Sequence, residues 1–160
     1  MAGTDKKKKD SSKINIVNRR AEYEFHFLDR MEAGIELTGT EIKSVRKGSA
    51  DLRDAYCFFK KGELYVKNLY IAEYDWGNQF NHEPRRLRKL LLRGAELRKM
   101  EKKIKERGFT IVPYRVYLNE RGFAKLEIAL AQGKKTHDKR ESIKEKDVKR
   151  DLDRIKKTRL

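Results

Sequence analysis

The apolar and polar positions of the chain follow the short periods of strands and helices from about Ile14 onward. In residues 21–28 three aromatic side chains alternate with polar ones, which is typical of a half-buried strand. A second short strand is expected at residues 34–37, where the apolar run is too brief for a helix. The chain therefore opens with β-structure.

Two segments have the signals of helices. Thr38 and Glu41 have the spacing of a capping box, and Gly48 lies where a left-handed residue ends a helix after an apolar stripe. In residues 94–107 apolar side chains recur at three- and four-residue intervals until Gly108. The exposed face of the first helix is basic.

The remaining periodic segments form two hairpins with a long connection between them. The paired strands are expected at residues 55–59 with 64–71, and at 110–118 with 123–130. About six strands in hairpins indicate a largely antiparallel sheet, and closure would remove its exposed edges. We expect a mainly β (α+β) fold, a closed or nearly closed antiparallel barrel with two or three flanking helices.

The two ends of the chain differ in composition from this middle part. Residues 1–13 are polar and Lys-rich and are expected to be disordered, and residues 14–131 form the barrel. Residues 132–160 are a basic tail with too few apolar residues to order alone. Val148, Leu152 and Ile155 nevertheless share one helical stripe, so the tail either folds on a partner or is only a solubilising segment.

Charge points to a polyanionic partner. The chain of 160 residues has 41 Lys and Arg against 25 Asp and Glu, a formal net charge of +16. Nucleic acid is the commonest partner for such a field, an anionic membrane surface is the next, and a merely charged skin is the third possibility. Cys57 is the only cysteine, which excludes an intrachain disulfide and fits the reducing cytoplasm. No apolar stretch is long enough to span a membrane.

Residues for catalysis or metal binding are not grouped in the sequence. The three histidines are far apart, and a single cysteine cannot build a zinc site. His82, between Asn81 and Glu83, is the one candidate base of a nuclease, but a histidine in a basic loop is more often an RNA contact or a solvated side chain. We expect that the protein is not an enzyme and that it binds no cofactor and no metal ion.

Binding residues are easier to find, because arginine forks and lysines suit phosphates. The basic clusters are Lys43, Arg46 and Lys47 on the first helix, and Arg85, Arg86, Arg88, Lys89 and Arg93 around the apolar run 90–92. In the connecting loop, residues 72–86, Tyr74 and Trp76 either stack on unpaired bases or pack on the barrel.

Three longer motifs resemble the SmpB family of SsrA-binding proteins. They are GTEIKSVRKG at residues 39–48, FNHEPRRLRKLLL at 80–92 and GKKTHDKR at 133–140, the last continued by Ile-Lys-Glu at 143–145. The likeness runs in order from about Asn15 to Arg150. The resemblance implies an oligonucleotide-binding (OB-like) barrel that is not catalytic.

The resemblance also implies partners and site residues. The barrel is expected to bind the tRNA-like domain of transfer-messenger RNA (tmRNA) and to deliver it to stalled ribosomes for trans-translation, through Asn18, Glu32 and Leu91. The tail is expected to become helical in the decoding centre and empty messenger channel, beside small-subunit rRNA. Its matching positions are Gly133, Lys134, Lys135, His137, Asp138, Lys139, Arg140 and Ile155.

Two positions and one alternative need separate mention. Glu32 would repel phosphate as a bare charge, so it either accepts hydrogen bonds from base edges or 2′-hydroxyls, or only caps a turn before Gly34. Val148 replaces an aromatic residue of some family members and keeps the apolar stripe without stacking. The alternative function is a structural ribosomal protein. We expect a cytoplasmic monomer that does not bind membranes.

Overall fold

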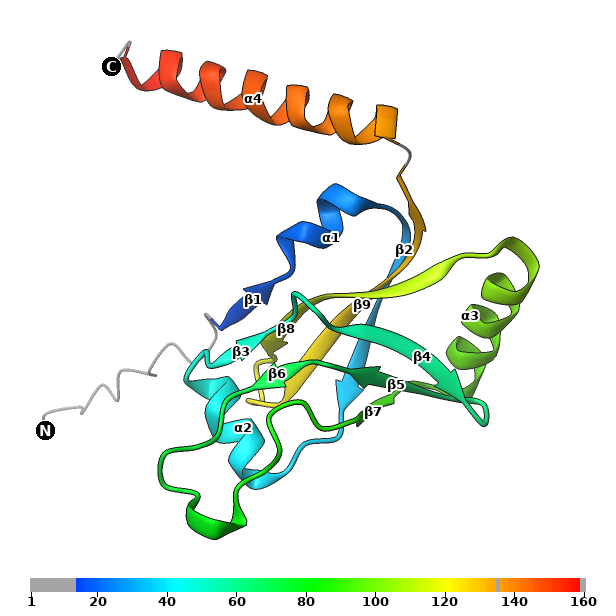
Figure 1. The fold of residues 1–160 in the computed structure, drawn as a ribbon, viewed down its shortest axis with the longest axis vertical. Coiled ribbons are helices and arrows are strands. Elements are labelled where there is room, and N and C mark those ends of the chain that lie inside the picture. Colours follow the sequence, from blue (N-terminus) through cyan, green and yellow to red (C-terminus); the bar gives the residue numbers. More distant parts are fainter. Residues whose placement is uncertain (1–13, 135, 159–160) are drawn as a thin grey trace, which may run out of the picture.

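The computed structural model describes residues 14–134 and 136–158, so the expectation for residues 1–13 lies outside the described part. Nine strands and four α-helices are found there (Figure 1), with a 3-10 turn η2 (Asn78–Phe80). The strands are β1 (Asn15–Val17), β2 (Phe25–Ile35), β3 (Ala50–Asp51), β4 (Tyr56–Lys60), β5 (Glu63–Lys67), β6 (Tyr70–Ile71), β7 (Arg88–Leu91), β8 (Thr110–Leu118) and β9 (Ala124–Gly133). The helices are α1 (Arg19–Glu24), α2 (Gly39–Arg46), α3 (Gly94–Arg107) and α4 (Thr136–Thr158).

The sheet is antiparallel, as expected for the closed or nearly closed barrel, but it is not closed. Seven strands pair in the order β1–β8–β9–β2–β7–β5–β4, and β3 pairs only with β6. Strands β1 and β4 are therefore the edges of an open sheet, although β4 lies against β8. The expected six strands become nine because two of them join in β2, the segment 64–71 is divided into β5 and β6, and β1, β3 and β7 are additional. Strands β1 and β3 have only three and two residues, too few to show a period.

The strand expected at residues 21–28 is wrong in its first half, which is helix α1. The side-chain Oδ1 of Asn18 accepts a hydrogen bond from the Ala21 N–H at 3.3 Å and caps this helix. Arg20 and Glu24 pair one turn apart at 2.9 Å. Strand β2 then runs from Phe25 to Ile35 and includes the first half of the second strand expected at residues 34–37. Capping and docking on β8 override the local alternation.

The hairpin of β4 and β5 and the helix α2 agree with the sequence pattern. Lys61 and Gly62 both have positive φ, +51° and +78°, as a tight two-residue hairpin turn requires. Glu41 Oε1 accepts from the Thr38 N–H at 3.1 Å, which is one half of the expected capping box. The strand expected over residues 64–71 is divided, because Asn68 is left-handed (φ +60°) and separates β5 from β6.

The hydrophobic core lies between the sheet, α2 and α3. Leu64, Leu90 and Leu126 from three strands are fully buried, and Met100 joins them from α3. Among the described residues, none of the helices combines the length and apolarity needed to cross a bilayer. This core holds the sheet and the two helices together, and it contains few of the basic residues.

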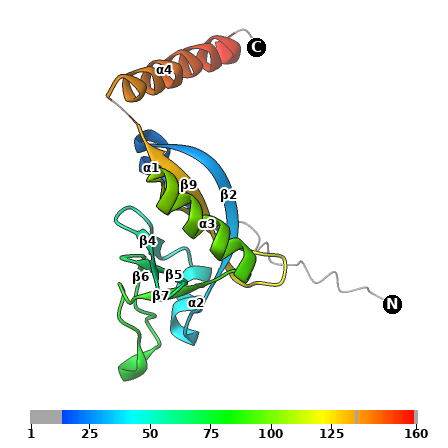
Figure 2. The ribbon, with the colours of Figure 1, turned by 90° about the vertical axis from the view of Figure 1, so that its right-hand side faces the viewer.

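The boundary between body and tail lies slightly later than expected. Strand β9 continues to Gly133, which pairs with Phe25. Lys134 donates its backbone N–H to Glu24 O at 2.8 Å and its Nζ to Glu22 O at 3.0 Å. Helix α4 begins after this and stands away from the sheet, beyond α1 (Figures 1 and 2). Disorder of the free tail stays a prediction.

Candidate nucleic-acid interface

A row of residues crosses three neighbouring strands on the outer face of the sheet. Gly34 in β2 pairs with Leu91 in β7 on one side and with Lys125 in β9 on the other. A Cβ on Gly34 would come within 3.2 Å of the Leu91 Cβ. Glycine therefore leaves the space over β2 that the Leu91 side chain occupies. Leu91 itself remains 51% exposed.

An apolar groove of about 350 Å³ lies beside this row. Its walls include Leu91 and Phe123, which is 62% exposed and immediately precedes β9. Arg46 from α2 lines the groove and donates from Nη2 to Gly122 O at 3.5 Å. Lys125 is the second cation of the lining. The groove thus combines an apolar lining with positive charge, as a nucleotide with its base and phosphate requires.

A second, more open groove continues from Leu91 and Lys125 and contains Glu32. The Tyr117 hydroxyl donates a hydrogen bond to Glu32 Oε2. Burial and the hydrogen bond to this carboxylate raise the pKa of Tyr117, so its hydroxyl keeps the proton at neutral pH. The Arg115 guanidinium lies 4.5 Å from the Tyr117 ring centroid. The Glu32 carboxylate is therefore oriented by a neighbouring side chain, and Glu32 lies within β2 rather than at a turn.

Arg88 was expected to bind phosphate, but the structure places it in the interior. Its side chain is fully buried and donates to Glu41 Oε2, to Leu69 O at 2.5 Å and to Pro84 O at 3.2 Å. A buried guanidinium whose donors already have protein acceptors cannot reach a phosphate. The sequence pattern misses this because a basic residue in a strand shows no sign of pointing inward.

The partner of Arg88 is the fully buried carboxylate of Glu41. Arg86 completes the cluster, with Nη2 donating to Glu41 Oε1 at 2.7 Å. Burial alone would raise the pKa of Glu41, but the hydrogen bonds from Thr38, Arg86 and Arg88 outweigh burial and lower it. The cluster joins α2 to the β6–β7 connection and to β7, so it positions α2 and Arg46 rather than binding RNA.

The other basic residues of the two clusters are at the surface. Lys43 and Lys47 of α2 lie over the Tyr74 ring, with Nζ 5.3 and 4.9 Å from its centroid. Arg85 lies over Tyr70, 5.5 Å from the ring centroid. Lys89 pairs with Glu63 at 3.0 Å, and this hydrogen bond raises the pKa of Lys89. These four residues lie outside the lining of the groove beside Leu91.

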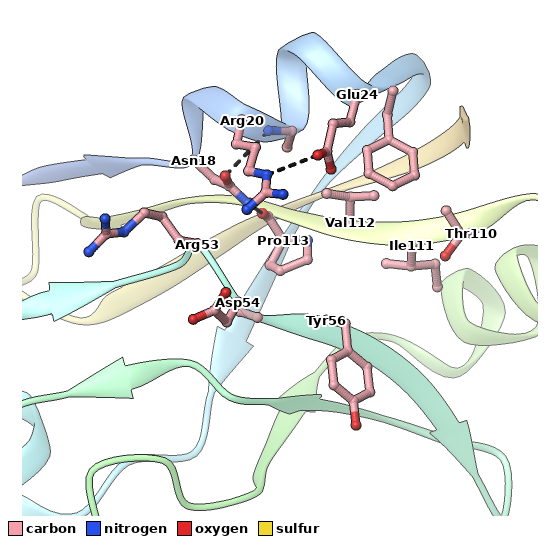
Figure 3. A pocket seen from close by; sticks show the side chains of 13 residues that line it. Asn18, Arg20, Glu24, Arg53, Asp54, Tyr56, Thr110, Ile111, Val112 and Pro113 are labelled. Atoms are coloured by element: carbon pink, nitrogen blue, oxygen red, sulfur yellow. Dashed lines mark hydrogen bonds and ion pairs between the residues drawn. The ribbon is translucent and has the colours of Figure 1, made fainter. Parts of the chain in front are cut away.

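Asn18 lies in a different cleft, of about 220 Å³, between α1, β8 and the segment before β4 (Figure 3). Its side chain is 5% exposed, caps α1 and donates to Leu52 O and Pro113 O, each at 3.3 Å. The lining of this cleft shares no residue with the two grooves beside Leu91. The buried amide positions α1, so an RNA role for Asn18 would be indirect.

The expected tail residues lie partly at the end of β9 and partly on α4. Gly133 lies in β9, Lys134 is tied to α1, and Lys139 of α4 lies over the Tyr23 ring with Nζ 5.8 Å from its centroid. Arg140 is exposed on α4. Lys135 lies outside the described residues, as do the side chains of His137 and Asp138. The apolar stripe of Val148, Leu152 and Ile155 is exposed on α4, and Ile143 is a further exposed apolar side chain of this helix.

His82 does not have the surroundings of a catalytic base. It is 7% exposed, with Nδ1 2.8 Å from Thr40 Oγ1 and Nε2 2.9 Å from Ile71 O. A carbonyl can only accept, so Nε2 donates and Nδ1 accepts from the Thr40 hydroxyl. Burial also raises the pKa of the Cys57 thiol, which disfavours a reactive thiolate. Within the described residues, no three His, Cys, Asp or Glu side chains group as metal ligands.

The sequence analysis missed Phe123, Gly34 and Tyr117 as parts of the site. Phe123 follows the Gly122 turn, and an aromatic residue at a hairpin tip was the available signal. The role of Gly34 depends on the register of β2 against β7, and that of Tyr117 on the order of β8, β9 and β2. Neither can be obtained from one strand alone.

Comparisons with known proteins agree on one family. The family model of the SmpB protein matches residues 15–158. The SsrA-binding protein of Phocaeicola vulgatus is 59% identical over 142 residues, 89% of this chain and 95% of the relative. That of Zymomonas mobilis is 52% identical over 144 residues, 90% of each chain.

A solved structure gives the same result for the fold. A chain from the structure described as "tmRNA-SmpB: a journey to the center of the bacterial ribosome" has a TM-score of 0.65 and 48% identity, covering 77% of this chain and 86% of that one. The names of the relatives describe a binding protein and not an enzyme. The chain belongs to the SmpB protein family.

Proposed function

We propose that this protein binds the tRNA-like domain of tmRNA and delivers it to ribosomes stalled in translation. The observation that carries the proposal is the pair of grooves on either side of Leu91, in a protein of net charge +16. The SsrA-binding relatives and the tmRNA–SmpB structure support the same partner.

The grooves account for recognition of a folded RNA with unpaired nucleotides. Leu91 and Phe123 offer apolar contact to a base or ribose, and Arg46 and Lys125 attract the neighbouring phosphates. Glu32, held by Tyr117, accepts a hydrogen bond from a base edge or a 2′-hydroxyl. A 2′-hydroxyl contact would favour RNA over DNA of the same sequence.

The tail supplies the second contact, with the ribosome. Helix α4 is basic and presents its apolar stripe of Val148, Leu152 and Ile155 to solvent. We infer that the tail enters the decoding centre and the empty messenger channel, where rRNA phosphates attract its lysines and arginines and its stripe packs. Any ordering of the tail on entry costs conformational entropy, which these contacts offset.

The test of the RNA site compares two leucines of equal exposure. Leu91 is 51% and Leu28 is 53% exposed, and both lie in strands of the same sheet. Because half of a leucine side chain remains to be buried on binding, Leu91→Ala is expected to weaken binding of the tRNA-like RNA about five-fold. Leu28→Ala is expected to leave affinity unchanged. Equal effects of the two substitutions, measured by filter binding at fixed salt, would contradict the assignment.

A further inference from the structure

The connecting loop, residues 72–87, presents two large aromatic side chains to solvent. Trp76 is 76% exposed and Phe80, in η2, is 82% exposed. The loop projects from the sheet below β6 and α2, at the end opposite α4 (Figure 1). Trp76 therefore does not pack on the barrel, which was one of its two sequence interpretations. Exposed aromatic surface of this kind on a charged protein is typical of a binding site.

Hydrogen bonds hold the loop in shape at the base of these aromatics. Asn81 bridges back to Tyr74, accepting from its N–H at 3.0 Å and donating to its carbonyl at 2.7 Å. A Cβ on Gly77 would approach the Asn81 amide to 2.7 Å, so only glycine fits the closed turn. His82 ties the loop to α2 and β6 through Thr40 and Ile71. These bonds preorganise the loop backbone that carries the two aromatics, which lowers the entropy cost of binding.

Positive charge lies at the same place. Tyr74, in the loop, has the ammonium groups of Lys43 and Lys47 over its ring at 5.3 and 4.9 Å. Lys47 also approaches Asp75 at 3.9 Å, an exposed pair that salt or a phosphate can displace. Aromatic faces beside lysines have the composition of surfaces that stack bases and track a phosphate backbone.

From this arrangement we propose that the loop is a second RNA contact, at which Trp76 and Phe80 stack on unpaired bases and Lys43 and Lys47 bind the adjoining phosphates. A membrane surface would also take up exposed aromatics beside lysines, but RNA is the partner of the proposed function, and two exposed rings at a loop tip suit stacking on its unpaired bases. Stacking tolerates any base because every base has a π face.

This proposal rests on RNA binding as the proposed function but uses a separate surface. The loop shares no lining residue with the grooves beside Leu91. Failure of the loop experiment with intact binding at the Leu91 groove would overturn only this inference. Loss of all RNA binding would instead overturn the proposed function.

Trp76 provides the readout, because it is the only tryptophan in the chain. The full-length protein is titrated with a single-stranded oligoribonucleotide and with a blunt duplex of the same sequence at equal salt. Stacking quenches indole emission, so we expect strong quenching by the single strand and little by the duplex. Phe80→Ala is expected to weaken single-strand binding about 5- to 150-fold, the range for losing one stacked base. Far-UV circular dichroism verifies folding.

Tyr56→Ala is the matched control, since it removes a 46% exposed aromatic of β4 that lines neither groove beside Leu91 and lies outside the loop. It is expected to leave the quenching of Trp76 by the short single strand unchanged. Equal quenching by duplex and single strand would mean backbone contact without stacking and would overturn the proposal. Trp76 emission that RNA leaves unchanged would also overturn the proposal. A shift of that emission by a ribosomal protein fraction or by anionic vesicles would then identify the other kind of partner.

Discussion

Replacing Arg88 by methionine tests whether this residue is structural. Arg88→Met keeps a long apolar stem but leaves Glu41, fully buried, with Arg86 as its only remaining cationic partner in the cluster. It also removes the donors to Leu69 O and Pro84 O. Breaking a buried pair by deleting one side costs about 3–5 kcal/mol, and the remaining Arg86 contact favours the lower end. We expect a loss of about 3 kcal/mol in the free energy of unfolding.

The assay is urea unfolding followed by far-UV circular dichroism, with RNA affinity measured in parallel and corrected for the folded fraction. Arg85→Met is the control, because Arg85 is half exposed and 3.9 Å from Asp54, and such a pair contributes about 0–1 kcal/mol. In the double variant Arg88→Met/Glu41→Leu the losses should fall short of additivity by about 1–3 kcal/mol. A stable Arg88→Met protein with strongly reduced RNA affinity would refute the structural role.

Two further predictions concern stability. Because the pKa of Glu41 is lower in the folded protein than its ordinary 4.5, its contribution is present above that pH and is lost as pH falls through the folded value. Acid titration of unfolding free energy should show a shallower decline in Glu41→Gln than in the parent, and parallel curves would contradict the shift. Asn18→Ala should cost about 1–2 kcal/mol by thermal or urea unfolding, because it removes the cap of α1. An unchanged midpoint would mean that α1 needs no cap.

Local signals predicted those elements whose chemistry is contained within a few neighbouring residues. The spacing of Thr38, Glu41 and Gly48 marked α2, and the turn at Lys61–Gly62 marked the β4–β5 hairpin. Such signals need no knowledge of the rest of the fold. They also identified the basic surface of α2, which remains exposed in the folded protein.

Features set by tertiary contacts were not accessible in the same way. The alternation of residues 21–28 indicates a strand, yet the Asn18 amide and the β8 surface favour a helix up to Glu24. Arg88 and Glu41 each look like surface charges in the sequence, and only the pairing of α2 with β7 reveals that both are buried. The open sheet likewise depends on whether two edge strands meet, which no single strand records.

The resemblance to the family supplied Glu32 and Leu91, and the structure supplies a physical reason for their proximity. Glu32 and Leu91 lie on the adjacent strands β2 and β7. Gly34 follows Glu32 by two residues in β2, and the Leu91 side chain lies over this glycine. Glu32 alone would be a poor RNA contact because of its charge, but Tyr117 orients its carboxylate as an acceptor. Their role in RNA binding stays a prediction until the Leu91 and Leu28 variants are compared.

The central claim is that the body of the protein binds the tRNA-like RNA while the tail binds the ribosome. A truncation after Lys134 tests this claim most directly. The structure places this cut later than the composition change at residue 131, because β9 pairs through Gly133 and Lys134 anchors the strand to α1. Affinity for the isolated tRNA-like RNA and rescue of stalled ribosomes are measured on the same truncated protein. We predict nearly unchanged affinity and abolished rescue. Loss of RNA affinity together with rescue would contradict the division between body and tail.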